Sequence, residues 1–295
     1  MVPLTDTKVD TGLLKERALR ALGELPPFSP ILNRLLASLA KDDVSFAKLG
    51  DLIEKDTVVA GNILHLVNSA LYARRGTINS VRHALSILGI NKLRNAVLGM
   101  SITRMWNQVR TPSSWSMARF NMHSASVAIL SDLLAQRLPV NYAEGAFVAG
   151  LLHDVGRLLL ALGLTEEYGR ILQMHDAEKK PLLRCEMEIT GMTHAELSAE
   201  ALAFWNLPAP IQTAVRHHHD TASDPSRLQS GEIALSVVLD AANQYVNSTG
   251  VTILKGSTED NDATLVARLG LGPDQVQAVL ADFKTELDAM SAFFR

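Results

Sequence analysis

"GLLHDVGRLLL", residues 150 to 160, sets a histidine and an aspartate inside a run of apolar side chains. A buried carboxylate without a partner costs on the order of several kcal/mol, or else its pKa shifts strongly. His153 and Asp154 therefore need polar or cationic partners. The position of other polar residues on apolar helix faces decides where those partners lie.

The composition is that of an ordinary globular protein. The chain has 295 residues, 47% of them hydrophobic, enough for one large domain or two small ones. The single cysteine, Cys185, excludes an intramolecular disulfide and fits a reducing compartment. The amino-terminal residues lack the apolar core of a signal peptide, and charged residues interrupt the longest apolar run, 146–164. We therefore expect a cytoplasmic protein that does not span a membrane.

The net charge of −3 conceals an asymmetry. No acidic residue occurs between Asp56 and Asp132. The same segment holds eight basic residues: Arg74, Arg75, Arg82, Lys92, Arg94, Arg104, Arg110 and Arg119. Such a segment can match an acidic face of the same chain, an acidic partner or an anionic ligand. Nucleic acid is the weakest of these interpretations, because aromatic residues are few and no recognition motif is present.

Helical periodicity runs through nearly the whole sequence, and strand-like alternation is absent. The sequence therefore predicts an all-α fold. The segment 107–115, "NQVRTPSSW", has the proline and serine content of a linker, and a second helical block starts near Ser116. We place the division between the two blocks near residue 112.

Two histidines fall on predicted core faces. His123 belongs to an apolar stripe with 3-4-3-4 spacing, formed with Phe120, Val127, Leu130 and Leu134. The face defined by Ile211 and Val215 continues to His218 and His219, whereas His217 falls off it.

Two further polar groups complete the set. Asp240 shares a stripe with Ile233 and Val237, which predicts that a second carboxylate points into the core. Thr193 and Glu196 form a T-x-x-E capping box, which predicts that a helix begins there with His194 in its first turn.

Buried imidazoles and carboxylates from several helices satisfy one another if a divalent metal lies between them. Histidine and carboxylate ligands suit Fe, Mn or Zn, and helical bundles build such centres from facing helices. The other interpretation of the same pattern is a polar network that is satisfied by hydrogen bonds alone.

"GLLHDVGRLLL" resembles the signature of the HD superfamily of metal-dependent phosphohydrolases, whose ligands follow the order H…HD…D. The chain is most similar to HDOD domains, the HD-related output domains of bacterial signalling proteins, through "VNSALY", "ILGINKLR", "HAELSAEALAFWNLP" and "HHH". The resemblance implies an N-terminal extension (1–24), a helical N-terminal block (25–112) packed on an HD-like bundle (113–250), and a C-terminal helical segment (251–295). It also implies six metal ligands for one or two ions: His123, His153, Asp154, His194, His218 and Asp240.

Two departures separate the chain from the related HD-GYP phosphodiesterases. Arg157 stands where those enzymes have a lysine, and no G-Y-P segment follows the histidine triplet. Arginine is permanently charged and can hold a phosphate, but it is a poor proton donor. The motif for cleavage of cyclic dinucleotides is therefore incomplete.

The expected function is a bacterial signal-transduction output module with an HD-type metal site, which binds a nucleotide, another phosphate-bearing ligand or a signalling protein. The alternative is a metal-dependent phosphohydrolase that acts on a nucleotide or a cyclic dinucleotide. In that case Asp154 would help to activate a metal-bound water, and Arg157 would neutralise the charge of the phosphate. The resemblance favours the non-catalytic module, and the ligand set favours the enzyme.

Overall fold

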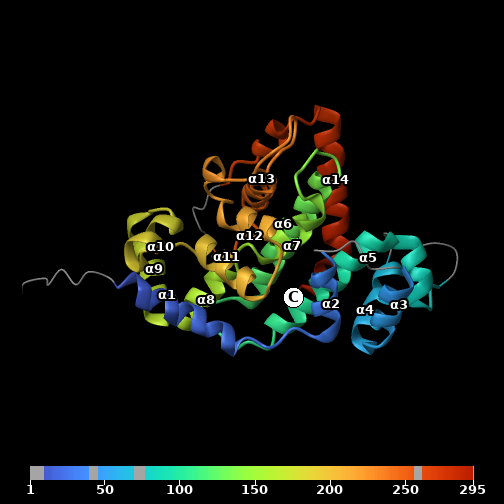
Figure 1. Cartoon of the computed structure of the whole chain (residues 1–295), viewed down its shortest axis with the longest axis horizontal. Coiled ribbons are helices and arrows are strands. Elements are labelled where there is room, and N and C mark those ends of the chain that lie inside the picture. Colours follow the sequence, from blue (N-terminus) through green and yellow to red (C-terminus); the bar gives the residue numbers. More distant parts are fainter. Residues whose placement is uncertain (1–9, 40–45, 70–76, 256–260, 295) are drawn as a thin grey trace, which may run out of the picture.

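The computed structural model describes residues 10–39, 46–69, 77–255 and 261–294. Over these ranges the chain is built from helices, and the strand-type pairing is one isolated bridge between Val140 and Ile233. The predicted all-α fold is thereby confirmed. Figure 1 shows how the helices are arranged.

The first helices of the chain run up to a long helix, α5. They are α1 (Thr11–Arg20), the 3-10 turn η1 (Ala21–Glu24), α2 (Pro30–Ser38), α3 (Phe46–Glu54), α4 (Thr57–Val67) and α5 (Val81–Trp106). Helix α5 is bent where Gly89 leaves the helical region, with φ of 76°. Glycine adopts positive φ at little cost, and so a glycine serves this bend.

The helices from Met117 onward carry the candidate site. They are α6 (Met117–Ala135), η2 (Ala143–Gly145), α7 (Ala146–Leu152), α8 (Val155–Gly163), α9 (Thr165–Glu178), α10 (Leu182–Thr190), α11 (His194–Phe204), α12 (Ala209–Arg216), η3 (Thr221–Ser223), α13 (Leu235–Ser248), η4 (Leu265–Leu269), α14 (Pro273–Met290) and η5 (Ser291–Phe293). Ser116 caps α6 by accepting a hydrogen bond from the Arg119 N–H. The predicted start near Ser116 is therefore confirmed.

Helices α6, α7, α8, α11 and α12 pack on one another at the centre of the molecule (Figure 1). The amino-terminal helix α1 lies against α8 and α11. Lys15 forms an ion pair of 3.0 Å with Glu200 of α11, and Arg17 forms one of 3.0 Å with Glu167 of α9. Helix α14 packs along α6. The central helices are thus covered by segments from both ends of the chain.

One stretch within the described ranges, Ala143–Gly163, is apolar and long enough to cross a membrane. It comprises η2, α7 and α8, and 94% of its most apolar window is buried inside the fold. Such burial is typical of a core helix in a soluble protein, because a membrane span would expose its apolar side chains to lipid.

Several residues of the basic segment pair within the chain. Arg82 contacts Asp51 at 2.8 Å, Arg104 contacts Asp56 at 3.5 Å, and Lys92 pairs with Glu286. Arg119 donates to the Ile253 carbonyl and the Thr252 hydroxyl. Arg74 and Arg75 lie outside the described residues. The ion pairs of Arg82, Arg104 and Lys92 support the interpretation that the basic segment matches acidic groups of the same chain.

A partly buried carboxylate lies where α5 meets α6. Burial raises the pKa of Asp132 to about 6, despite hydrogen bonds from Asn95 and Gln136, and the nearby Glu286 adds to the rise. A carboxyl group whose pKa is higher in the folded than in the unfolded state stabilises the fold only while it is protonated. The contribution is complete below the unfolded value near 4 and is lost as pH rises through about 6.

We therefore predict that Asp132→Asn will change the pH dependence of stability. The asparagine stays neutral, and so the variant should gain about 1–3 kcal/mol relative to the native chain between pH 4 and pH 7. Urea unfolding of both proteins across this pH range measures the difference. If the free energies of unfolding of the native chain and Asp132→Asn differ by the same amount at every pH from 4 to 7, Asp132 has an ordinary pKa.

Candidate metal centre

Two glycines let the helices around the His153–Asp154 pair approach closely. A Cβ atom on Gly150 would lie 2.6 Å from the Ala128 Cα of α6, and one on Gly156 would lie 2.0 Å from the His194 carbonyl oxygen of α11. Both distances are far below a normal contact. Only glycine fits at these positions, and so "GLLHDVG" brings α7 onto α6 and α8 onto α11.

His153 and Asp154 lie at a break between two helices. Helix α7 ends at Leu152 and α8 begins at Val155, and the pair occupies the turn between them. The capping box of α11 forms as predicted, since Thr193 accepts from the Glu196 N–H while Glu196 accepts from the Thr193 N–H. It fixes His194 as the first residue of that helix.

Five of the six predicted ligands come together around the carboxylate of Asp154. Their relative exposures are His123 1%, His153 0%, Asp154 1%, His194 0% and His218 0%. Oδ2 of Asp154 lies 3.5 Å from the Nε2 atom of His123 and 3.3 Å from that of His153. Oδ1 lies 3.0 Å from Nε2 of His194 and 4.0 Å from Nε2 of His218.

Backbone carbonyls fix the orientation of three of these imidazoles. Nδ1 of His123 lies 2.8 Å from the Val251 oxygen, Nδ1 of His153 lies 2.8 Å from the Gly150 oxygen, and Nδ1 of His218 lies 2.6 Å from the Val215 oxygen. A carbonyl oxygen only accepts, and so each Nδ1 carries the hydrogen. In the neutral imidazole Nε2 then presents a lone pair.

In the neutral form of these rings, the Nε2 lone pairs face a carboxylate, which is itself an acceptor. The Nε2 atoms of His123, His153 and His218 are buried without a hydrogen-bond partner in the described structure, and all three face the Asp154 carboxylate. A buried acceptor without a partner is costly. Three rings in their neutral form and a carboxylate that converge in this way could hold a cation.

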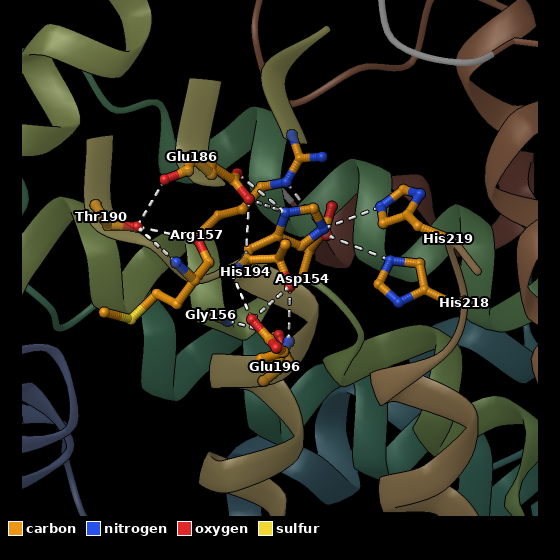
Figure 2. Close-up of polar contacts among 12 residues, drawn as sticks. Asp154, Gly156, Arg157, Glu186, Thr190, His194, Glu196, His218 and His219 are labelled. Atoms are coloured by element: carbon orange, nitrogen blue, oxygen red, sulfur yellow. Dashed lines mark hydrogen bonds and ion pairs between the residues drawn. The ribbon is translucent and has the colours of Figure 1, made fainter. Parts of the chain in front are cut away.

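Glu186 on α10 belongs to the centre, although the sequence analysis did not single it out. The side chain is buried, and its Oε2 accepts both the His194 backbone N–H at 2.8 Å and Nδ1 at 2.7 Å. Figure 2 shows Glu186 at one edge of the His194 ring, with His218 and His219 beyond the other. A carboxylate behind a ligating histidine orients the ring and raises its basicity.

The available signal for Glu186 was its place on an apolar face. It lies between Leu182 and Ile189 at helical spacing, and both are buried.

His219 is a second residue near the centre that the predicted ligand set did not include. Its Nε2 lies 3.0 Å from Nε2 of His194, and the residue is partly exposed.

The possible metal-binding atoms fall into two groups that share Asp154. Asp154, His153 and His123 form the first group, and Asp154, His194, His218 and His219 form the second. Within each group, one ligand atom per residue lies within 4.8 Å of every other. A carboxylate that joins two groups of histidines has the arrangement of a one- or two-metal site.

Arg157 borders the centre through its Nε atom. The residue is 3% exposed, and its Nε lies 3.3 Å from Oδ1 of Asp154. Burial would raise the pKa of Asp154, but the Arg157 guanidinium, together with the positive charge that the neighbouring histidines carry when protonated, holds it well below its usual range. Asp154 is therefore ionised.

The two histidines at the Oδ1 side differ in their protonation. Burial lowers the pKa of His194, but Glu186 and Asp154 outweigh it and raise the value to about 9. For His218, burial, reinforced by the neighbouring histidines, brings the pKa well below its usual range. His218 is therefore neutral and presents a lone pair.

The prediction that Asp240 points into the core is wrong. Asp240 is only partly buried, its Oδ1 accepts from Gln244 of the same helix, and it belongs to neither group of ligands. The stripe was set by Ile233, which precedes α13 and pairs with Val140 instead. The buried residues of the helix have a different phase, which includes Leu235, Leu239, Ala242 and Val246.

Comparison with protein families identifies an HDOD domain, whose model matches residues 25–221. A curated protein of uncharacterised function from Treponema pallidum (strain Nichols) is 20% identical over 215 residues. The match covers 69% of this chain and 39% of the relative, so the chain spans about two fifths of the relative's length.

Solved structures share the fold. An HDOD domain protein of unknown function from Geobacter sulfurreducens is 23% identical, with a TM-score of 0.75 over 97% of this chain and 98% of that one. A candidate phosphohydrolase from Shewanella amazonensis SB2B is 21% identical, with a TM-score of 0.71 over 95% and 98%. A candidate signal transduction protein from Marinobacter aquaeolei VT8 is 19% identical, with a TM-score of 0.69 over 99% and 69%.

Proposed function

The chain belongs to the HDOD family, and we propose that it is a signalling output module which retains a divalent-metal centre without hydrolysing phosphodiesters. The observation that carries the proposal is the convergence of imidazole lone pairs on the ionised carboxylate of Asp154. A divalent cation among these groups would satisfy the buried acceptors. His123, His153, Asp154, His194 and His218 would hold Fe, Mn or Zn.

Burial of the centre favours a non-catalytic role. His123, His153 and Asp154 are each at most 1% exposed, so a phosphate ester would need a rearrangement of the helices to reach them. The guanidinium of Arg157 lies against Asp154 within the same buried region. It would therefore contribute positive charge beside a ligand carboxylate.

A metal bound here would connect the central helices. Its ligands come from α6, from the turn between α7 and α8, from the first residue of α11 and from the segment after α12. Loss or exchange of the ion would change how these helices pack, and a partner that reads this packing would receive the signal. The name of the Marinobacter protein, a candidate signal transduction protein, supports this role.

Hydrolysis is the second candidate function. Two groups of histidines that share one carboxylate favour it, as does the name of the Shewanella protein, a candidate phosphohydrolase. A bound divalent ion would lower the pKa of a coordinated water. His219 is the partly exposed member of the set and would face a nucleotide or other phosphate-bearing ligand first.

The cellular setting and the domain limits follow from the same proposal. A metal-dependent output module with one buried thiol, Cys185, suits the bacterial cytoplasm. Residues 1–24 would form an extension, 25–112 the N-terminal block, 113–250 the HD-like bundle and 251–295 the C-terminal segment. Signalling partners would bind at the outer surface of these helices.

The test is metal content and turnover in the native chain and in Asp154→Ala. The native protein should retain iron, manganese or zinc, and Asp154→Ala should lose it because both ligand groups lose their shared carboxylate. Asp240→Ala is the matched control and should keep the metal. Elemental analysis with circular dichroism of each protein measures the outcome.

Turnover separates the two candidate functions. The metal-loaded native protein should not hydrolyse bis-p-nitrophenyl phosphate or cyclic dinucleotides. Turnover that disappears in Asp154→Ala would establish the phosphohydrolase instead. A folded native protein that stays metal-free when Fe, Mn and Zn are supplied would refute the metal centre.

A further inference from the structure

The segment that follows α13 runs back across the start of α6. Helix α13 ends at Ser248, and Gly250, with φ of 82°, turns the chain away from it. Residues 251–254 then lie against α6, where Nδ1 of His123 donates to the Val251 carbonyl at 2.8 Å. These residues lie beyond the part of the chain that matches the HDOD model, which ends at residue 221. A predicted metal ligand is therefore held by a segment outside the family match.

Arg119 fastens the 251–254 segment to α6. It lies one turn before His123 on the same helix, so both side chains project from one face of α6. Its Nε donates to the Ile253 carbonyl at 3.1 Å, and a second guanidinium nitrogen donates to the Thr252 hydroxyl at 2.8 Å. The Thr252 hydroxyl in turn donates to the Leu254 carbonyl at 2.7 Å. Three consecutive residues are thus held by contacts that begin at one guanidinium.

Two apolar side chains anchor the same segment. Ile253 is 2% exposed and belongs to the main core, and Leu254 packs on a smaller apolar cluster formed by α9 and α10. Helix α10 also carries Glu186, whose carboxylate accepts from His194. The segment therefore connects the helix that bears His123 with the helix that supports His194.

From these contacts we infer that Arg119 is a positioning residue of the metal centre, because it holds the Val251 carbonyl at Nδ1 of His123. The inference rests on the proposed metal centre and adds a part of the chain that sets how tightly the ion is held. The Val251 oxygen belongs to the peptide unit that joins Val251 to Thr252. The contacts of Arg119 with Thr252 and Ile253 therefore fix the direction of that oxygen.

The Val251 carbonyl selects the tautomer of His123. A carbonyl oxygen only accepts, so the hydrogen of the neutral ring stays on Nδ1 and Nε2 offers its lone pair to an ion. If the carbonyl moved away, an Nδ1 hydrogen on this buried ring would lose its acceptor, which is costly. The hydrogen would then favour Nε2, where Oδ2 of Asp154 lies 3.5 Å away and can accept it. In that form His123 cannot bind a metal through Nε2.

Loss of the Arg119 contacts should therefore weaken metal binding. Arg119→Met keeps the length of the side chain and removes both hydrogen bonds. The Kd for Zn²⁺, measured by competition against a chelator, should rise by about 10–100-fold, as is usual when the partner of a ligating histidine is lost. Thr252→Val keeps the shape of the side chain, removes the hydroxyl and should raise the Kd in the same direction. It remains informative if circular dichroism shows that Arg119→Met does not fold.

Arg137→Met is the matched control. Arg137 follows the other end of α6, and its partners, the Leu133 carbonyl and Asp282, lie outside the 251–254 segment. The substitution removes an arginine of the same helix region without touching the contacts of Val251, Thr252 or Ile253. It should leave the Kd for Zn²⁺ unchanged.

The tautomer of His123 separates positioning from packing. NMR of the imidazole nitrogens in the metal-free native chain should show the hydrogen on Nδ1 of His123, with His123→Ala identifying the signal. In Arg119→Met the hydrogen should move in part to Nε2, whereas Arg137→Met should keep the native form. If Arg119→Met loses affinity while His123 keeps its hydrogen wholly on Nδ1, Arg119 acts through packing alone and the inference is overturned.

The remaining outcomes separate this inference from the proposed function. A native chain that binds Zn²⁺, with Arg119→Met and Thr252→Val binding it equally tightly, overturns the role of Arg119 and leaves the metal centre standing. A folded native chain that binds no Mn²⁺, Fe²⁺ or Zn²⁺ overturns the metal centre itself, and the inference with it.

Discussion

Gly156→Ala should lower the free energy of unfolding by more than about 3 kcal/mol, at the upper end of what overpacking costs. The added Cβ would lie 2.0 Å from the His194 carbonyl oxygen and 2.8 Å from the Ser198 nitrogen. Both atoms belong to the backbone of α11, so no change of rotamer relieves the overlap. Helices α8 and α11 would have to separate.

That separation would also reach the metal centre. Gly156 is two residues from Asp154, and the Gly156 N–H donates to the Ser198 hydroxyl at 2.8 Å. Displacing α8 from α11 lengthens the 3.0 Å approach between Oδ1 of Asp154 and Nε2 of His194. The substitution should therefore weaken metal binding as well as stability.

Urea unfolding of the chelator-treated protein measures the stability without the metal. The matched control is Gly169→Ala on α9, because Gly169 is exposed and a Cβ there meets nothing within 4 Å. Alanine should stabilise that helix by about 0.5–1 kcal/mol. If Gly156→Ala unfolds at the same urea concentration as the native chain, the close approach of α8 and α11 does not contribute to stability.

The sequence predicted those parts of the site that depend on local helical phase. His123 lies on a stripe whose members all belong to α6, and that stripe is buried as expected. His218 follows the buried face of α12, and His194 follows a capping box. In each case the apolar spacing and the polar group lie on one continuous element, or within one turn of its end.

The remaining parts of the site depend on how separate elements meet. Ile233 lies outside α13, so it could not set the phase of Asp240. The role of Glu186 depends on α10 packing beside the first turn of α11, which no spacing within either helix encodes. Arg157 was expected to neutralise a phosphate only if the chain is a hydrolase, and its Nε atom also lies 3.3 Å from Oδ1 of Asp154, a contact that the sequence analysis did not anticipate. Pairing between distant segments is a tertiary property that local periodicity does not reveal.

Glu186→Ala should destabilise the chain by about 3–5 kcal/mol, because it leaves His194 with two buried N–H donors and no acceptor. Glu186→Gln keeps the size and one acceptor oxygen but removes the charge. It should cost less stability and yet weaken metal binding by about 10–100-fold. The reason is that a neutral amide supports the basicity of His194 less than a carboxylate does.

Metal affinity and stability together distinguish a positioning role from simple packing. Glu188→Gln is the matched control on α10, because Glu188 is exposed and pairs with Lys180 at 2.8 Å. Glu188→Gln should change neither the free energy of metal binding nor the free energy of unfolding by more than about 1 kcal/mol. Competition against a chelator gives the Kd for the metal, and urea unfolding of the metal-free protein gives the stability. If Glu186→Gln loses stability but binds metal as tightly as the native chain, Glu186 supports only the packing of α10. A loss of affinity that exceeds the loss of stability would show that the carboxylate acts on the metal through the ring of His194.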